Sequence, residues 1–223
     1  AGFRQLPWGW MLAAAASIAA YNLLFFKGVL GAGVGVGTVL AIGGAPIWVT
    51  LFTIVVLRRR PDRITMFGQG LSITGAALLV LSGGSESSSL SGIILSILAG
   101  AAYAAYSTIT SKIRDAAPSV TVAAATFGMA AVLVVPVFFI APLNWALALS
   151  PMALLIFLGV VVTGLSYALY TKGLQTVPAA SAVTLALAEP LTAWLLATFL
   201  VGEANTPAKM AGAALLIAGL YVG

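Results

Sequence analysis

The chain is built from apolar runs of about 20 residues, separated by short breaks rich in Gly, Pro, Ser and charged residues. A helix needs roughly 20 such residues to cross the hydrocarbon core of a bilayer. The runs predict eight helices, at about 6–26, 34–57, 64–82, 90–113, 120–140, 152–173, 179–201 and 206–222. The sequence therefore predicts an all-α fold, a polytopic membrane helix bundle.

Composition narrows the classes of function. Only 7% of the residues are charged, whereas a soluble domain carries roughly 25%. The chain has no His and no Cys, so the usual imidazole base, thiolate nucleophile and zinc ligands are missing. We expect no enzyme, no metal and no cofactor. The net charge of +5 comes from residues scattered at helix ends, so we expect no nucleic-acid partner.

The basic residues predict an orientation, because Lys and Arg in short loops stay on the cytoplasmic side. With Arg4 inside, eight alternating crossings leave only Lys27 and Lys209 on the opposite side. The inside set is Arg4, Arg58, Arg59, Arg60, Arg63, Lys112, Arg114 and Lys172.

The first three helices resemble the last three at an offset of 144 residues. The matched pairs are Pro46 and Pro190, Gly68 and Gly212, and Gly75 and Gly219, while Lys27-Gly28 and Lys172-Gly173 match one residue off that offset. Matching helices lie five positions apart in helix order, an odd number, so they cross the membrane in opposite directions. Chance matching of Gly and Pro is the alternative. The reversal of charge from Arg59 to Glu203 counts against it.

This inverted repeat divides the chain into a first repeat at 1–83 and a second repeat at 89–223. Partners for the helices at 90–113 and 120–140 would precede Ala1, so we expect a complete protein with ten helices, and we also expect the C-terminus to continue. Two inverted halves can exchange conformations, which is the physical basis of alternating access. A membrane scaffold of duplicated origin is the alternative.

Several motifs of the second half resemble a known family. They are Gly164-Leu-Ser-Tyr-Ala-Leu-Tyr-Thr-Lys-Gly-Leu, Pro178-Ala-Ala-Ser-Ala, Leu187-Ala-Glu-Pro-Leu, Gly202-Glu203 and the run Gly212 to Gly219. They are similar to the EamA half of the drug/metabolite transporter superfamily. The first half looks like a weaker copy, in which Ala45 and Arg59 replace Glu189 and Glu203. The resemblance implies a ten-helix transporter made of two inverted five-helix units.

Within that superfamily, the segment 100–112 resembles the bacterial aromatic amino-acid exporter branch. The branch implies export of amino acids or related small metabolites, aromatic or neutral amino acids among them, across the bacterial cytoplasmic (inner) membrane. The alternatives are a multidrug or organic-cation exporter and, outside transport, a scaffold subunit or a membrane-embedded enzyme. The expected partners are a small-molecule substrate and the lipid bilayer, with the protein a monomer or a homodimer.

Hydroxyl and aromatic side chains at helical spacing predict a substrate cavity, because buried hydroxyls in a membrane need polar partners. The candidates are Tyr21, Asn22, Phe25, Tyr103, Tyr106, Ser107, Thr163, Tyr167, Tyr170 and Glu189. Interfacial anchoring or ordinary packing is the alternative for each Tyr. Glu189 is the only acid well inside a predicted span, where an ionisable group is costly. It can bind a substrate ammonium group or carry a proton, and a structural hydrogen bond is the rival role.

The residues Gly92, Ser96, Gly100 and Ala104 recur every four positions, a pattern that lets helix backbones approach closely. Pro46 and Pro190 lie near the middle of their helices, where proline removes a backbone donor. With Gly43 and Gly44 they predict deformable points in the helices at 34–57 and 179–201. A static kink is the alternative.

Overall fold

The computed structural model describes residues 6–55, 58, 62–82, 89–140, 146, 149–202 and 205–222, and all regular secondary structure in these ranges is helical. Two compact units divide the chain. The first unit comprises 1–19 and 106–178, and the second comprises 20–105 and 179–223. Helices α1 and α5 contribute residues to both units, and each unit is described by itself below.

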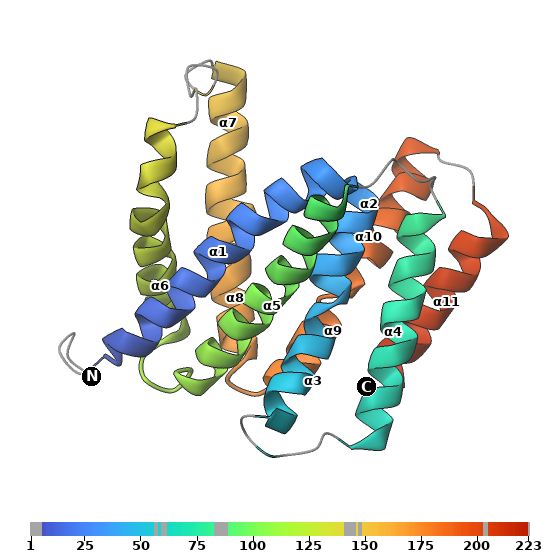
Figure 1. The fold of residues 1–223 in the computed structure, drawn as a ribbon, viewed down its shortest axis with the longest axis horizontal. Helices are drawn as coiled ribbons and strands as arrows, with labels where there is room; N and C mark the ends of the chain where they lie inside the picture. The colour runs from blue at the N-terminus through green and yellow to red at the C-terminus, as the bar shows by residue number, and fades with distance from the viewer. Residues whose placement is uncertain are drawn as a thin grey trace. The chain divides into compact units, whose positions relative to one another are not determined.

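All eight predicted runs are helical (Figure 1). The helices are α1 (Trp8–Ala32), α2 (Val34–Thr38), η2 (Val39–Gly43), α3 (Ala45–Val55), α4 (Arg63–Leu81), α5 (Leu90–Lys112), α6 (Ser119–Val134), η3 (Val135–Phe139), α7 (Leu149–Phe157), η5 (Leu158–Leu165), α8 (Ser166–Gly173), α9 (Ala179–Leu185), α10 (Ala188–Leu196), η6 (Ala197–Val201) and α11 (Pro207–Val222). Within the described ranges, seven continuous stretches are long and apolar enough to cross a membrane, and α11 is a shorter apolar helix.

Helix α1 is longer than predicted, because it runs to Ala32 instead of ending near residue 26. Lys27 and Gly28 do not break it, and the chain leaves the helix at Gly33, whose φ of 81° only glycine adopts freely. The prediction therefore placed this break too early. Gly31 packs against Gly92 of α5.

In the second unit, α4 and α11 pack through glycines and lie side by side in Figure 1. A methyl group added at Gly75 would lie 2.6 Å from the Gly212 carbonyl oxygen, and one added at Gly219 would lie 2.6 Å from the Gly68 carbonyl oxygen. These distances are shorter than real Cβ contacts, so both positions require glycine. The small-residue faces of the two helices are therefore used within one molecule.

The 144-residue offset converts each of these two glycine contacts into the other. Gly68 corresponds to Gly212 and Gly75 to Gly219, so the contact of Gly75 with Gly212 maps onto that of Gly219 with Gly68. The two helices also run antiparallel, because Gly68 of α4 contacts Gly219 of α11, whereas the later residue Gly75 contacts the earlier residue Gly212. Antiparallel packing with this exchange is what an inverted repeat requires.

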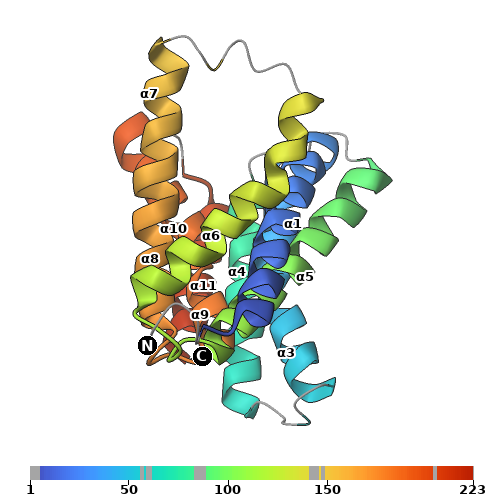
Figure 2. The same cartoon turned by 90° about the vertical axis from the view of Figure 1, so that its left-hand side faces the viewer.

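In the first unit, α6 packs against α8, and both helices can be followed in Figure 2. An apolar cluster closes one end of the unit and comprises Leu6, Met11, Ile113 and Val122. Beside it, the Lys112 ammonium lies 3.8 Å from the centroid of the Trp10 ring, a cation–π contact. The cluster holds the start of α1 against the loop between α5 and α6.

Candidate functional site

The small-residue stripe of α5 brings α1 and η2 close to it. An added methyl at Gly28 would lie 2.9 Å from the Ser96 backbone nitrogen, and one at Gly100 would lie 2.7 Å from the Ala41 carbonyl oxygen. The predicted close packing along the stripe is therefore confirmed. It sets how near the larger side chains of α1 and α5 lie to each other.

This approach brings three predicted site residues of the second unit together, which we call the α1–α5 aromatic group. Tyr21 and Phe25 lie one turn apart on α1, with ring centroids 5.5 Å apart and planes inclined by 29°. The Tyr103 ring of α5 lies 5.1 Å from that of Tyr21. Tyr103 is nearly buried, whereas Tyr21 and Phe25 are half-buried. The exposed part of the group therefore belongs mainly to Tyr21 and Phe25.

Glu189 lies in the first turn of α10, and its side chain is exposed. It is close enough to Tyr21 for its charge to act on the phenol. Asn22, next to Tyr21 on α1, is also exposed. A carboxylate exposed within a span requires water or a polar partner, since hydrocarbon leaves its charge unsolvated.

The helices that carry Pro46 and Pro190 are both interrupted just before the proline. In the first, the π-helical segment η2 ends at Gly43, and Gly44 separates it from α3. In the second, Ala186 and Leu187 form a turn between α9 and α10. At the 144-residue offset Gly44 corresponds to Ala188, so the two interruptions lie within two residues of each other. The Arg59 and Glu203 pair of the charge reversal lies outside the described residues.

Four more predicted site residues meet in the first unit. The Tyr170 hydroxyl donates a 2.9 Å hydrogen bond to Ser107 Oγ, and the Tyr106 and Tyr170 rings stack with centroids 6.4 Å apart. Tyr167 lies edge-on to Tyr106 at 5.7 Å. Tyr106 and Ser107 are fully buried, while Tyr167 and Tyr170 are half-buried. Thr163, half-buried in η5, lies one turn before this cluster.

Sequence reasoning missed several polar residues around these candidates. The hydroxyl of Thr171 lies beside that of Tyr106, and Thr171 is buried. In the second unit, buried Thr50 donates a 2.9 Å hydrogen bond to the Gln69 amide oxygen. Gln69 was the available signal, because an amide inside an apolar span usually bonds across helices.

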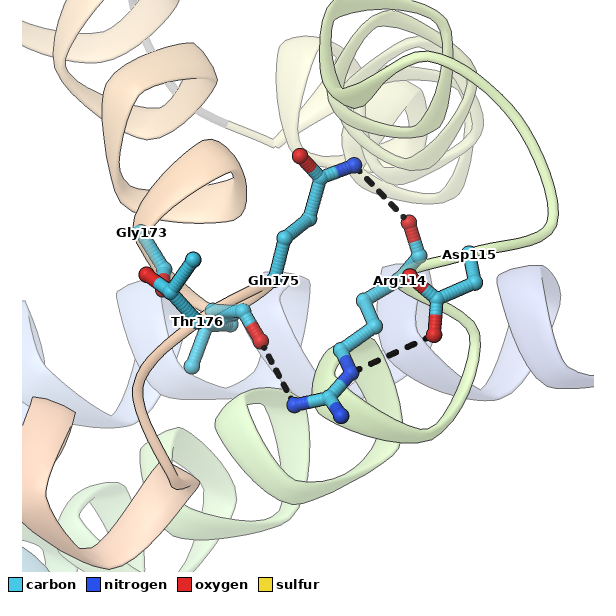
Figure 3. Close-up of polar contacts among 6 residues, drawn as sticks. Arg114, Asp115, Gly173, Gln175 and Thr176 are labelled. Atoms are coloured by element: carbon cyan, nitrogen blue, oxygen red, sulfur yellow. Dashed lines mark hydrogen bonds and ion pairs between the residues drawn. The ribbon is translucent and has the colours of Figure 1, made fainter.

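Sequence reasoning also missed an interlock between two loops of the first unit, by which we mean the pair of hydrogen bonds that joins Arg114 to Leu174 and Gln175 (Figure 3). Arg114 Nη1 donates to the Leu174 carbonyl oxygen at 3.0 Å, and Gln175 Nε2 donates to the Arg114 carbonyl oxygen at 3.2 Å. Arg114 Nε also lies 3.4 Å from the Asp115 carboxylate. Charge counting assigned Arg114 to topology alone, because its partners lie about 60 residues away along the chain.

The model of the EamA-like transporter family matches residues 90–222. An uncharacterized transporter of Bacillus subtilis (strain 168), YwfM, is 36% identical over 217 residues, which is 96% of this chain and 73% of the relative. An uncharacterized transporter of Archaeoglobus fulgidus is 28% identical over 135 residues, covering 59% of this chain and 47% of the relative.

A solved crystal structure of another protein superposes with a TM-score of 0.83 at 19% identity, over 99% of this chain and 79% of that one. This likeness concerns the fold alone. The family match and the identity to YwfM carry the assignment, which favours a transporter over a scaffold and over an enzyme. The chain is a multi-pass membrane protein that belongs to the EamA-like transporter family.

Proposed function

We propose that the protein exports amino acids or related small metabolites across the bacterial inner membrane by alternating access. The observation that carries this proposal is that the charge of the Glu189 carboxylate acts on Tyr21, a member of the α1–α5 aromatic group with Phe25 and Tyr103. A carboxylate pairs with an ammonium group, and ring faces attract the same cation and stack on flat apolar groups. Amino acids with aromatic or neutral side chains offer both features.

The two interrupted helices are the proposed moving parts. Gly43, Gly44 and Pro46 form one deformable point, and Pro190 marks the other. A helix missing a backbone donor bends more easily at that point. The exchange symmetry of α4 and α11 supports two inverted halves, which we assign to 1–83 and 89–223, that swap conformations at similar energy.

Export of organic cations is the second candidate, and the same site supports it. A cation without a carboxylate pairs with Glu189 and stacks on the rings as well as an amino acid does. The difference lies in the substrate carboxylate, which must find donors. The phenol of half-buried Tyr21 provides a donor within the group, and this favours amino acids.

Counterflow in proteoliposomes tests the proposal. Vesicles containing the protein are loaded with one unlabelled compound, and uptake of the same compound in labelled form is followed. The experiment is repeated for a panel of amino acids and aromatic cations, with and without a proton gradient. We expect counterflow by aromatic or neutral amino acids and none by protein-free vesicles. Counterflow by cations alone would replace the first candidate with the second, and counterflow by neither would contradict both.

A further inference from the structure

An apolar groove in the second unit shares no lining residue with the α1–α5 aromatic group. Its volume is about 330 Å³, within the range of small-molecule pockets. It is lined by Trp48, Leu51, Phe52 and Val55 of α3 and by Ala101, Ala104 and Ala105 of α5. The three alanines leave room between the helices, and the four large side chains of α3 form a wall.

The groove offers little to a polar ligand, because its lining side chains are apolar apart from the indole N–H of Trp48. Its α3 wall is partly exposed, with Leu51 at 45%, Phe52 at 41% and Val55 at 71%. Both helices are candidate membrane spans, so the medium around this wall is lipid. The groove is therefore complementary to a hydrocarbon chain.

Basic residues follow the groove along the chain. Val55 is the last residue of α3, and Arg58 comes three residues later, within roughly 11 Å measured between Cα atoms. Arg58 and Arg63 are both exposed, and neither forms an ion pair within the described part of the chain.

Asp62 is the one acidic residue described beside these arginines. Its carboxylate accepts a 2.6 Å bond from the Thr65 N–H as the N-cap of α4. This bond lowers the pKa of Asp62, so the residue keeps its charge at neutral pH. Two positive charges against one negative leave this end of the groove basic.

We propose that the groove binds one acyl chain of an anionic phospholipid, whose phosphate pairs with Arg58 and Arg63. The predicted orientation places these arginines at the cytoplasmic leaflet, where anionic lipids attract basic residues near helix ends. The wall of the groove belongs to the segment after Gly44. A bound lipid therefore holds α3 against α5 just beyond the deformable point.

Quenching of Trp48 by brominated lipids tests this site. The full chain is placed in phosphatidylcholine vesicles that contain increasing fractions of phosphatidylglycerol with brominated chains, or of brominated phosphatidylcholine. The signal of Trp48 is the difference between the wild type and Trp48→Phe. We expect half-maximal quenching at a several-fold lower fraction of phosphatidylglycerol than of phosphatidylcholine.

Variants separate the two parts of the site. Arg58→Gln and Arg63→Gln should raise the half-quenching fraction of phosphatidylglycerol at least threefold, and Lys172→Gln should not. Ala101→Leu fills the groove and should weaken quenching by both lipids, whereas Ala124→Leu, on an exposed face of α6, should leave it unchanged. Arg58 lies outside the candidate spans and Arg63 is the exposed first residue of α4, so their variants should fold, which the midpoint of thermal unfolding checks.

Three results would overturn the proposal. Equal quenching by both lipids in the wild type would mean ordinary bulk lipid. Displacement of phosphatidylglycerol by millimolar inorganic phosphate would mean an anion site without a bound chain. Protection of Trp48 from both lipids, with crosslinking between copies, would mean that a second copy covers the groove.

Discussion

At the residue scale, Glu189 is the side chain whose chemistry the proposed transport depends on most. Its side chain is exposed in the first turn of α10 and acts on Tyr21. Glu189→Gln keeps the shape and removes the charge. A charge-assisted hydrogen bond contributes about 1.5–3 kcal/mol, so we expect KM for an amino acid to rise about tenfold or more.

The pH dependence of transport should flatten in the same Glu189→Gln variant if the carboxylate carries the proton. Counterflow measured between pH 5.5 and 8.5 checks this, with Asp115→Asn as the control, because Asp115 is an exposed acid in a loop. An unchanged KM and an unchanged pH profile would assign Glu189 a structural role.

A second prediction at this scale concerns the bond from Tyr170 to Ser107. Tyr170→Phe removes the hydroxyl that donates to the buried Ser107 oxygen. We therefore expect the free energy of unfolding to fall by about 1–3 kcal/mol. Tyr221→Phe is the matched control, since Tyr221 is 92% exposed. Unfolding in detergent measures both. Ser107→Ala added to Tyr170→Phe should cost little more, and full additivity would contradict the bond.

At the element scale, the pairing of α4 with α11 depends on glycine. Gly75→Ala and Gly219→Ala should each destabilise the protein, because overpacking costs about 1–3 kcal/mol and exceeds the roughly 1 kcal/mol that alanine adds to helix propensity. Gly70→Ala on the same helix meets nothing within 4 Å and should stabilise it. Thermal unfolding compares the three variants. Unequal effects at Gly75 and Gly219 would count against the equivalence of the two contacts under the 144-residue offset.

The interruption of the helix before Pro46 gives a further prediction. A methyl group added at Gly44 would clash with the Leu40 carbonyl oxygen, whereas one at Gly43 would make an ordinary 3.7 Å contact with Val39. Gly44→Ala should therefore force the π-helical turn to rearrange and slow counterflow severalfold, with Gly43→Ala near the wild-type rate. Equal rates for the two variants would show that transport does not use this turn.

At the scale of the whole molecule, the positive-inside pattern predicts which loops face the cytoplasm. The natural chain has no Cys, so single cysteines report cleanly. A membrane-impermeant maleimide applied to intact cells should label Ser89→Cys and Ser150→Cys, and it should label Thr176→Cys only after permeabilisation. All three positions are exposed. The reverse pattern would invert the orientation.

The sequence by itself determined the number and order of the helical runs, although α1 extends beyond its predicted end. A span must be apolar over about 20 residues, and this requirement is written locally along the chain. The stripe of Gly92, Ser96 and Gly100 likewise predicted close packing, because small residues at helical spacing define a face. The EamA motifs around Pro190 were equally local, and they pointed to the transporter family.

Only the tertiary structure decided which faces meet. Periodicity places Gly75 on a face but does not say that α11 covers it, since the partner lies more than 100 residues away along the chain. The same limit hid the bond between Tyr170 and Ser107 and the interlock of Arg114 with Gln175. Long-range contacts depend on how helices pack in three dimensions. A sequence pattern shows which residues share a face of one helix, but not which other helix packs against that face.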